Sequence, residues 1–181
     1  MTIDRATPLR ALAEALVRQP GASMEQLAQT IGVSRATLHR LVSSRDELFK
    51  ELSDFAYETC RATFASVHLD EGPADDVLQR LVAALNPNAN LFLFLRRHGR
   101  ECAHKHEDWQ EQRKLLVAFF QRGQEEGVFR VDVSAQWLVD SLGALLHAAA
   151  EAAYEQRLAR ADMNHVVCSV LLDGARRRHS A

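Results

Sequence analysis

The stretch from Ser23 to Leu48, SMEQLAQTIGVSRATLHRLVSSRDEL, decides the fold. Apolar residues recur at helical spacing on both sides of Gly32, and this spacing predicts that Leu27 and Leu38 face a shared core. The glycine permits a tight turn between two short helices, because it adopts positive φ without steric cost. The stretch therefore predicts a helix-turn-helix whose second helix begins after Ser34.

Serine residues are placed to cap the helices of this stretch. Ser23 and Ser44 are followed three residues later by Gln26 and Glu47, which is the spacing of a capping box. Ser34 is expected to cap the second helix of the motif. A further helix is predicted from about Arg45 into the mid-60s, with no Ser/Gly-rich hinge inside it.

The second helix of the motif has one side that is free to face outward. Leu38 and Val42, four residues apart, are expected to hold the opposite side against the core together with Ala28 and Val33. Arginine and threonine side chains contact phosphates and base edges in DNA complexes, and a small residue keeps such a surface shallow. The candidate DNA-binding residues are Ser23, Ser34, Arg35, Ala36, Thr37, His39, Arg40 and Arg45. The alternative interpretation is an ordinary helical hairpin.

The rest of the chain also has helical periodicity, which predicts an all-α fold. A first helix, roughly Thr7 to Arg18, ends at Pro20-Gly21, and two apolar helices are expected at about Ser134 to Arg157 and Met163 to Arg176. Turns are expected at residues 69–73 and 86–88, and helix stops at Gly99, Gly123 and Gly127. We expect a DNA-binding domain over residues 1–50, continuous with a larger helical domain over residues 51–181.

Composition narrows the class of protein. The 181 residues are 47% apolar and 25% charged, as in ordinary globular proteins. No apolar run approaches the roughly 18 residues of a membrane helix, so a cytoplasmic protein without a membrane partner is expected. Residues 1–50 hold seven Lys or Arg and five Asp or Glu, a net charge of +2, whereas residues 51–181 have a net charge of −4. This asymmetry predicts that a phosphate-binding surface lies in the N-terminal part of the chain.

Several kinds of chemistry find no support in the sequence. The three cysteines form no CxxC pair, which favours reduced thiols over a disulfide framework or a zinc ribbon. GxSxG, HExxH, P-loop and GxGxxG motifs are absent, so no enzyme activity and no cofactor are expected.

The helix-turn-helix segment resembles that of the tetracycline-repressor (TetR) family. The match consists of the run Ile31-Gly32-Val33-Ser34 followed by Ala36, Thr37 and Leu38. Departures are His39, where the family usually has Tyr, Val42, where it has Phe, and Arg45, where it has Lys. Arg45 keeps the cation, and His39 can still donate a hydrogen bond to a phosphate.

A second similarity to the family lies far along the chain. Residues 126–132, EGVFRVD, lead into the helix that contains Trp137 and Leu138, as family members commonly pass from sensor core to dimerisation helices. The resemblance implies a homodimeric regulator that binds double-stranded operator DNA. It further implies a repressor released from the operator by a small, mostly apolar effector.

Two sets of residues follow for the C-terminal domain. The resemblance implies a dimer interface built from both final helices, for which the candidates are Leu138, Leu142, Leu145, Ala149, Ala152, Val166, Val167 and Val170. The alternative is that these stripes fill the core of a single subunit. For the effector, large side chains at helical spacing suggest Phe92, Trp109, Leu116 and Phe120.

One cluster suggests a different regulator. His98, Cys102 and His106 fall at intervals of four residues, with His104 close by, and offer donors suited to zinc or copper. Against this, Gly99 is expected to break the helix, and the arginines nearby disfavour a cation. We therefore predict no metal site, and keep a metal-responsive regulator, or a helical ligand-binding module without DNA binding, as alternatives.

Overall fold

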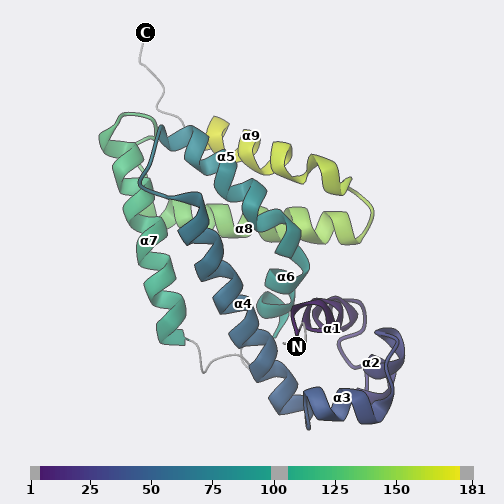
Figure 1. The fold of residues 1–181 in the computed structure, drawn as a ribbon. Coiled ribbons are helices and arrows are strands. Elements are labelled where there is room, and N and C mark those ends of the chain that lie inside the picture. Colours follow the sequence, from purple (N-terminus) through teal and green to yellow (C-terminus); the bar gives the residue numbers. More distant parts are fainter. Residues whose placement is uncertain (1–4, 99–105, 176–181) are drawn as a thin grey trace. The chain divides into compact units, whose positions relative to one another are not determined.

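The computed structural model describes residues 5–98 and 106–175, and these are helical throughout, joined by turns, with no strand among them. The predicted all-α fold is confirmed (Figure 1). The chain forms two compact units. Unit 1 comprises Met1–Thr59 with Asn90–Glu107, and unit 2 comprises Cys60–Ala89 with Asp108–Ala181.

Unit 1 contains the predicted helix-turn-helix. Its helices are α1 (Ala6–Arg18), α2 (Met24–Thr30), α3 (Arg35–Leu41), the first part of α4 (Arg45–Val67) and nearly all of α6 (Ala89–Arg97). The predicted core residues Leu27, Ala28, Leu38 and Val42 are all buried. Apolar side chains with at most 2% exposure from α1, α4 and α6 join them, which gives the unit a core of its own.

Helix α6 contributes to that core from a distant part of the sequence. The Phe94 ring lies 5.4 Å from the Phe49 ring, and the His98 ring lies 4.9 Å from Phe49, between ring centroids. Arg97 Nη1 donates a 2.6 Å hydrogen bond to the carbonyl of Val17, at the end of α1. Unit 1 therefore extends beyond the expected boundary at residue 50 and includes a segment from the middle of the chain.

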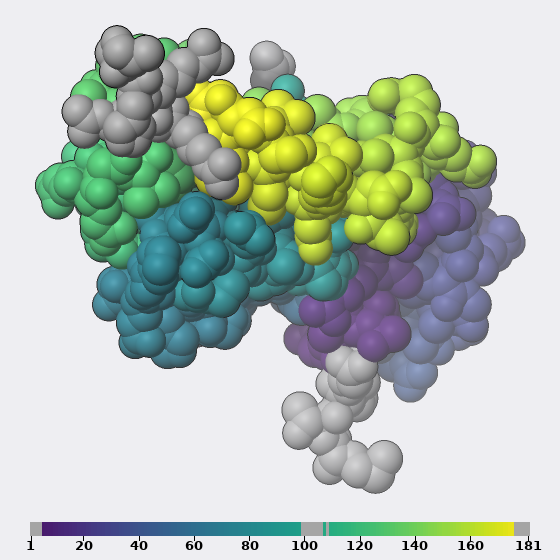
Figure 2. Space-filling view, turned by 90° about the horizontal axis from the view of Figure 1, so that it is seen from above, coloured from purple at the N-terminus to yellow at the C-terminus, as the bar shows by residue number. Residues whose placement is uncertain are grey.

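Unit 2 contains the remaining helices. They are α5 (Ala74–Leu85), the short 3-10 helix η1 (Asn86–Asn88), α7 (His106–Glu125), α8 (Ala135–Tyr154), η3 (Arg160–Asp162) and α9 (Met163–Ala175). Helices α8 and α9 run side by side, and α5 packs on α9 (Figure 1). The outer flank of α9 lies at the surface, where it forms a yellow band beside α5 (Figure 2).

The predicted helix stop at Gly123 is wrong, because α7 continues through this residue to Glu125. The missing side chain of this glycine instead allows the ring of Phe129 to pack closely against α7. A Cβ atom placed on Gly123 would overlap the ring of Phe129 and lie 3.0 Å from Cβ of Ala74. The turn occurs at Gly127, whose φ is +75°, and the amides of Val128 and Phe129 donate back to the Gly123 carbonyl.

Within residues 5–98 and 106–175, no helix is both long enough and apolar enough to cross a bilayer.

Candidate DNA-binding surface and ligand cavity

The turn between α2 and α3 has the geometry that the sequence predicts. Gly32 has a φ of +73°, the left-handed region that favours glycine. The amide of Gly32 donates to the Gln29 carbonyl at 3.1 Å, and the amide of Val33 donates to the Ala28 carbonyl at 2.9 Å. The turn thus satisfies the last carbonyls of α2 while it redirects the chain into α3.

Side chains cap both helices of the motif. The Ser23 hydroxyl accepts from the Gln26 amide at 3.2 Å, and the Gln26 side chain accepts from the Ser23 amide at 2.7 Å, so the predicted capping box is confirmed. The Ser34 hydroxyl accepts from the Thr37 amide at 3.1 Å, as expected for the cap of α3. These bonds fix where α3 begins and therefore which of its residues face outward.

Helix α3 presents a continuous polar surface. Leu38 is buried, whereas the remaining candidates in and before the helix are exposed: Ser34, Arg35, Ala36, Thr37, His39 and Arg40. Arg40 Nη2 lies 3.4 Å from the Thr37 hydroxyl, so these two side chains lie next to each other on this face. Two arginines, a threonine and a histidine around one alanine form a surface suited to phosphates and base edges. We call these six residues the α3 surface.

Arg45 has a different set of contacts from the other candidates. Its guanidinium donates to the carbonyls of Pro20 and Ala22, at 2.6 and 2.7 Å, and lies 5.0 Å from the centroid of the Phe49 ring. It therefore holds the turn between α1 and α2 against α4. A signal for this role exists in the sequence, since Pro20-Gly21 ends a helix and leaves carbonyls that need donors.

The second predicted capping box forms only in part. The Ser44 hydroxyl accepts from the Glu47 amide at 3.1 Å, as expected. The Glu47 carboxylate, however, accepts from the amide and hydroxyl of Ser43 instead of the Ser44 amide. Ser43 offers two donors to one carboxylate, and these hydrogen bonds lower the pKa of Glu47.

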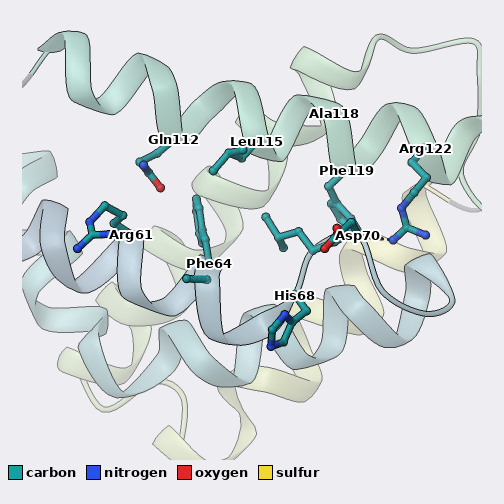
Figure 3. Close-up of a pocket in the computed structure, with 11 residues that line it drawn as sticks. Arg61, Phe64, His68, Asp70, Gln112, Leu115, Ala118, Phe119 and Arg122 are labelled. Atoms are coloured by element: carbon teal, nitrogen blue, oxygen red, sulfur yellow. Dashed lines mark hydrogen bonds between the residues drawn. The ribbon is translucent and has the colours of Figure 1, made fainter.

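A cavity of about 490 Å³ lies in unit 2, between the last turns of α4 and helix α7. Its walls are mainly apolar, with Phe64 from α4 and Leu115 and Phe119 from α7 (Figure 3). The full lining is Arg61, Phe64, Ala65, His68, Leu69, Asp70, Gln112, Leu115, Ala118, Phe119 and Arg122. We call this the α4–α7 cavity.

None of the four residues suggested for ligand binding lines the α4–α7 cavity. Phe120 is fully buried and packs on Phe119 and Phe129, with ring centroids 5.0 and 5.2 Å away. Trp109 and Leu116 belong to α7 but are not part of the lining, and Phe92 belongs to unit 1. Large apolar side chains at helical spacing more often fill a core than line a cavity.

The polar residues of the cavity differ in how they are engaged. Arg122 donates to the carbonyls of Leu69 and Gly72, each at 3.0 Å, and to the carboxylate of Glu126 at 2.5 Å. Gln112 is only 7% exposed, and its Oε1 has no hydrogen-bond partner within the described part of the chain. Sequence reasoning missed Gln112, although its spacing from Leu115 and Phe119 places a polar residue in an apolar stripe of α7.

A groove of about 390 Å³ follows the contact between α8 and α9. Trp137 and Val170 line it and are 63% and 52% exposed, which is unusual for large apolar side chains at one site. Of the residues suggested for the dimer interface, Leu138, Leu142, Ala149 and Val167 are buried inside the subunit, Leu145, Ala152 and Val166 are partly exposed, and Val170 is exposed. The apolar residues of α8 and α9 thus pack into the core of the subunit on one side of each helix and reach the surface on the other.

The proposed metal ligands are only partly described. The His98 ring is buried between Phe49 and Phe94, with both centroids 4.9 Å away. Cys102 and His104, like the expected stop at Gly99, lie outside the described residues, and so does the side chain of His106. Among the residues that are described, no three His, Cys, Asp or Glu side chains gather in a way that would hold a metal ion.

The two cysteines that the structure describes are buried. Burial raises the pKa of Cys60 to about 12 and also raises that of Cys168. Because the thiolate is the reactive form, both thiols are poor nucleophiles at neutral pH.

No family model matches the chain. Individual known proteins, however, are similar to it in sequence and in fold. The HTH-type transcriptional regulator NfxB of Pseudomonas aeruginosa is 32% identical over 171 residues, which cover 92% of this chain and 91% of that protein. Among solved structures, the TetR-like regulator LfrR of Mycobacterium smegmatis, in complex with proflavine, superposes with a TM-score of 0.76 at 23% identity over 94% of each chain. The ketosteroid regulator KstR2 of Mycobacterium tuberculosis gives a TM-score of 0.75 at 16% identity over 98% of each chain. Sequence identity along nearly the whole length and the shared all-α architecture lead to one conclusion: the chain belongs to the TetR family of helix-turn-helix transcriptional regulators.

Proposed function

We propose that this regulator is a homodimeric repressor, which binds a palindromic operator through the α3 surface and is released by a small-molecule effector. The observation that carries the proposal is the α3 surface itself, where exposed Arg35, Thr37 and Arg40 surround Ala36 on a helix whose start is fixed by the Ser34 cap. A helix of this kind lies in the major groove, with its first turns against the bases.

Selection from random DNA duplexes by the purified full-length protein tests the proposal. A two-fold dimer places two recognition helices about one DNA turn apart, so the enriched site should be a palindrome with half-sites about 10 base pairs apart. The affinity for that site should fall steeply as salt rises, because binding releases counterions from the phosphates. Failure to enrich any sequence, together with no binding at low salt, would contradict operator binding.

Arg40→Ala should weaken binding to the selected operator by about tenfold, because one arginine contact to a base or phosphate is lost. Fluorescence anisotropy with a labelled duplex measures the change. Lys114→Ala is the matched control, since it removes one exposed cation from α7 in unit 2 and leaves the α3 surface intact. Equal affinity of the Arg40 variant and the wild type would remove Arg40 from the interface.

For the dimer we propose the groove between α8 and α9 as the contact surface. Side chains that are buried within one subunit offer little area to a second, so the contact falls to Trp137, Leu145 and Val170, the exposed or half-buried members of the groove. Exposed apolar side chains gathered at one place are typical of protein interfaces.

Val170→Asp should weaken dimerisation at least about tenfold, because a carboxylate would lose its hydration in an apolar contact. Analytical ultracentrifugation over a dilution series measures the dissociation constant. Val131→Asp is the matched control: Val131 is 66% exposed and does not line the groove. A dimer as stable in the Val170 variant as in the control would exclude this groove as the interface.

A further inference from the structure

From the geometry of the α4–α7 cavity we infer that it binds a neutral aromatic molecule that carries an N–H or O–H donor, with Gln112 Oε1 as the acceptor. This inference rests on the proposed function, in which a small-molecule effector releases the repressor from its operator, and adds the location and chemical class of that effector.

The size and the walls suit a ring system. A volume of about 490 Å³ lies within the range of cavities that hold drug-sized ligands. Phe64 and Phe119 enter the lining from different helices and are themselves almost fully buried, so their rings are held in place (Figure 3). Leu115, in contrast, is 49% exposed, and a ligand in the cavity would remove this apolar surface from water. Aromatic rings contribute large contact areas in such walls.

The polar atom selects a donor. Gln112 extends from α7 towards α4, into the space between the two helices (Figure 3). Its Oε1 is buried and accepts no hydrogen bond from the described residues, which is costly for an amide oxygen in an apolar setting. A ligand hydroxyl or amine next to this atom would supply the missing donor. A methyl group in the same place would leave it unsatisfied.

The charges favour a neutral molecule. The charge of Arg122 is paired with Glu126, and its two terminal nitrogens also donate to backbone carbonyls. Its buried Nε has no hydrogen-bond partner among the described residues. Arg61 and Asp70, both exposed, bring opposite charges to the lining. His68 Nδ1 lies 3.7 Å from the Glu71 carboxylate. No single sign of charge dominates the lining, and this argues against both a carboxylate and a cationic ligand.

Two probes of nearly equal shape test the inference on the full-length protein without DNA. The probe 2-naphthol carries a donor and is neutral at pH 7, whereas 2-methylnaphthalene has the same ring system and no donor. By isothermal titration calorimetry, 2-naphthol should bind at least about tenfold more tightly, because only it satisfies the buried acceptor. Equal affinity, or no saturable binding of 2-naphthol, would overturn the inference.

The variant Gln112→Leu tests whether Gln112 Oε1 causes the preference for 2-naphthol over 2-methylnaphthalene. The variant keeps similar volume but has no acceptor, so 2-naphthol should bind about tenfold more weakly while 2-methylnaphthalene binds as before or better. Gln121→Leu is the matched control, because Gln121 lies exposed on the same helix outside the cavity. A preference for 2-naphthol that survives in folded Gln112→Leu protein would also overturn the inference.

A second variant keeps the test decisive if Gln112→Leu does not fold. Ala118→Phe adds a ring at an exposed position of the lining, so folding should be preserved while the cavity is filled. Both probes should then bind at least about tenfold more weakly than to the wild type. Unchanged binding of both probes would place them outside the α4–α7 cavity.

Operator binding is measured separately, with and without 2-naphthol, so that the two proposals can fail independently. If 2-naphthol binding depends on Gln112 but leaves operator affinity unchanged, ligand binding in the α4–α7 cavity is supported. The same result contradicts the proposal that a ligand in this cavity releases the protein from its operator. Absence of probe binding in a protein that binds its operator would overturn the cavity alone.

Discussion

Replacement of Gly123 by alanine is expected to lower the free energy of unfolding by about 2 kcal/mol. The added Cβ would overlap the ring of Phe129, which is fully buried, and would approach Cβ of Ala74 to 3.0 Å. Phe129 cannot turn away easily, because its ring also packs on those of Phe119 and Phe120. Overpacking of this kind outweighs the roughly 1 kcal/mol by which alanine favours a helix over glycine. Urea unfolding followed by far-UV circular dichroism, at fixed protein concentration, measures the change.

Gly143→Ala is the matched control for this prediction. Gly143 lies inside α8, and a Cβ built there meets no atom within 4 Å. Only the helix preference remains, so this variant should be more stable than the wild type by roughly 0.5 to 1 kcal/mol. If both glycine variants were stabilised, the close packing of α7 against Phe129 would be contradicted.

Arg45→Ala is expected to lower the free energy of unfolding by about 2 kcal/mol, because the carbonyls of Pro20 and Ala22 would lose a charged donor. The ring of Phe49 would also lose the guanidinium that lies over it. Urea unfolding measures this loss. Arg40→Ala, which changes an exposed side chain of the α3 surface, should stay within about 0.5 kcal/mol of the wild type.

Arg45→Lys separates a structural role of Arg45 from a phosphate contact. Lysine keeps the positive charge, but it lacks the planar fork that reaches two carbonyls from different nitrogens. We expect it to recover less than half of the stability that Arg45→Ala loses. A lysine variant with wild-type stability and wild-type operator affinity would show that charge alone matters at this position.

The helix-turn-helix could be predicted because its signals are local. Gly32, Ser34 and Leu38 act within a few residues, through a turn, a cap and a buried side chain, and the structure has all three as expected. The surface that a helix exposes follows directly once its buried side is known.

The features that sequence reasoning missed depend on distant partners. The carbonyl partners of Arg45 lie 23 and 25 residues away, and Phe94 packs on Phe49 across 45 residues of chain. Glycine commonly ends helices, which predicts a helix stop at Gly123, whereas this glycine makes room for Phe129. The helix end at Pro20-Gly21 indicates that carbonyls there need donors, but it does not specify which distant residue supplies them.

The four residues suggested for effector binding stay a prediction, and none of them lines the α4–α7 cavity. Large aromatic side chains are natural candidates for a binding site, but Phe120 is fully enclosed by its neighbours. The informative residue is the polar one, Gln112, in line with Leu115 and Phe119 on α7. A buried amide without a partner becomes visible only when the surrounding helices are in place.

The position of α6 in unit 1 has a consequence for the order of synthesis. A ribosome completes α1, α2 and α3 early, but Phe94 and Arg97, which pack on Phe49 and bond to Val17, emerge only after all of α5 has been made. Until then the nascent unit 1 leaves the Phe49 side of its core open to water, where it is exposed to chaperones and aggregation. A fragment that ends at Thr59 would remain in this state permanently. Most of unit 1 is therefore translated early, but its core is completed only after α6 has been made.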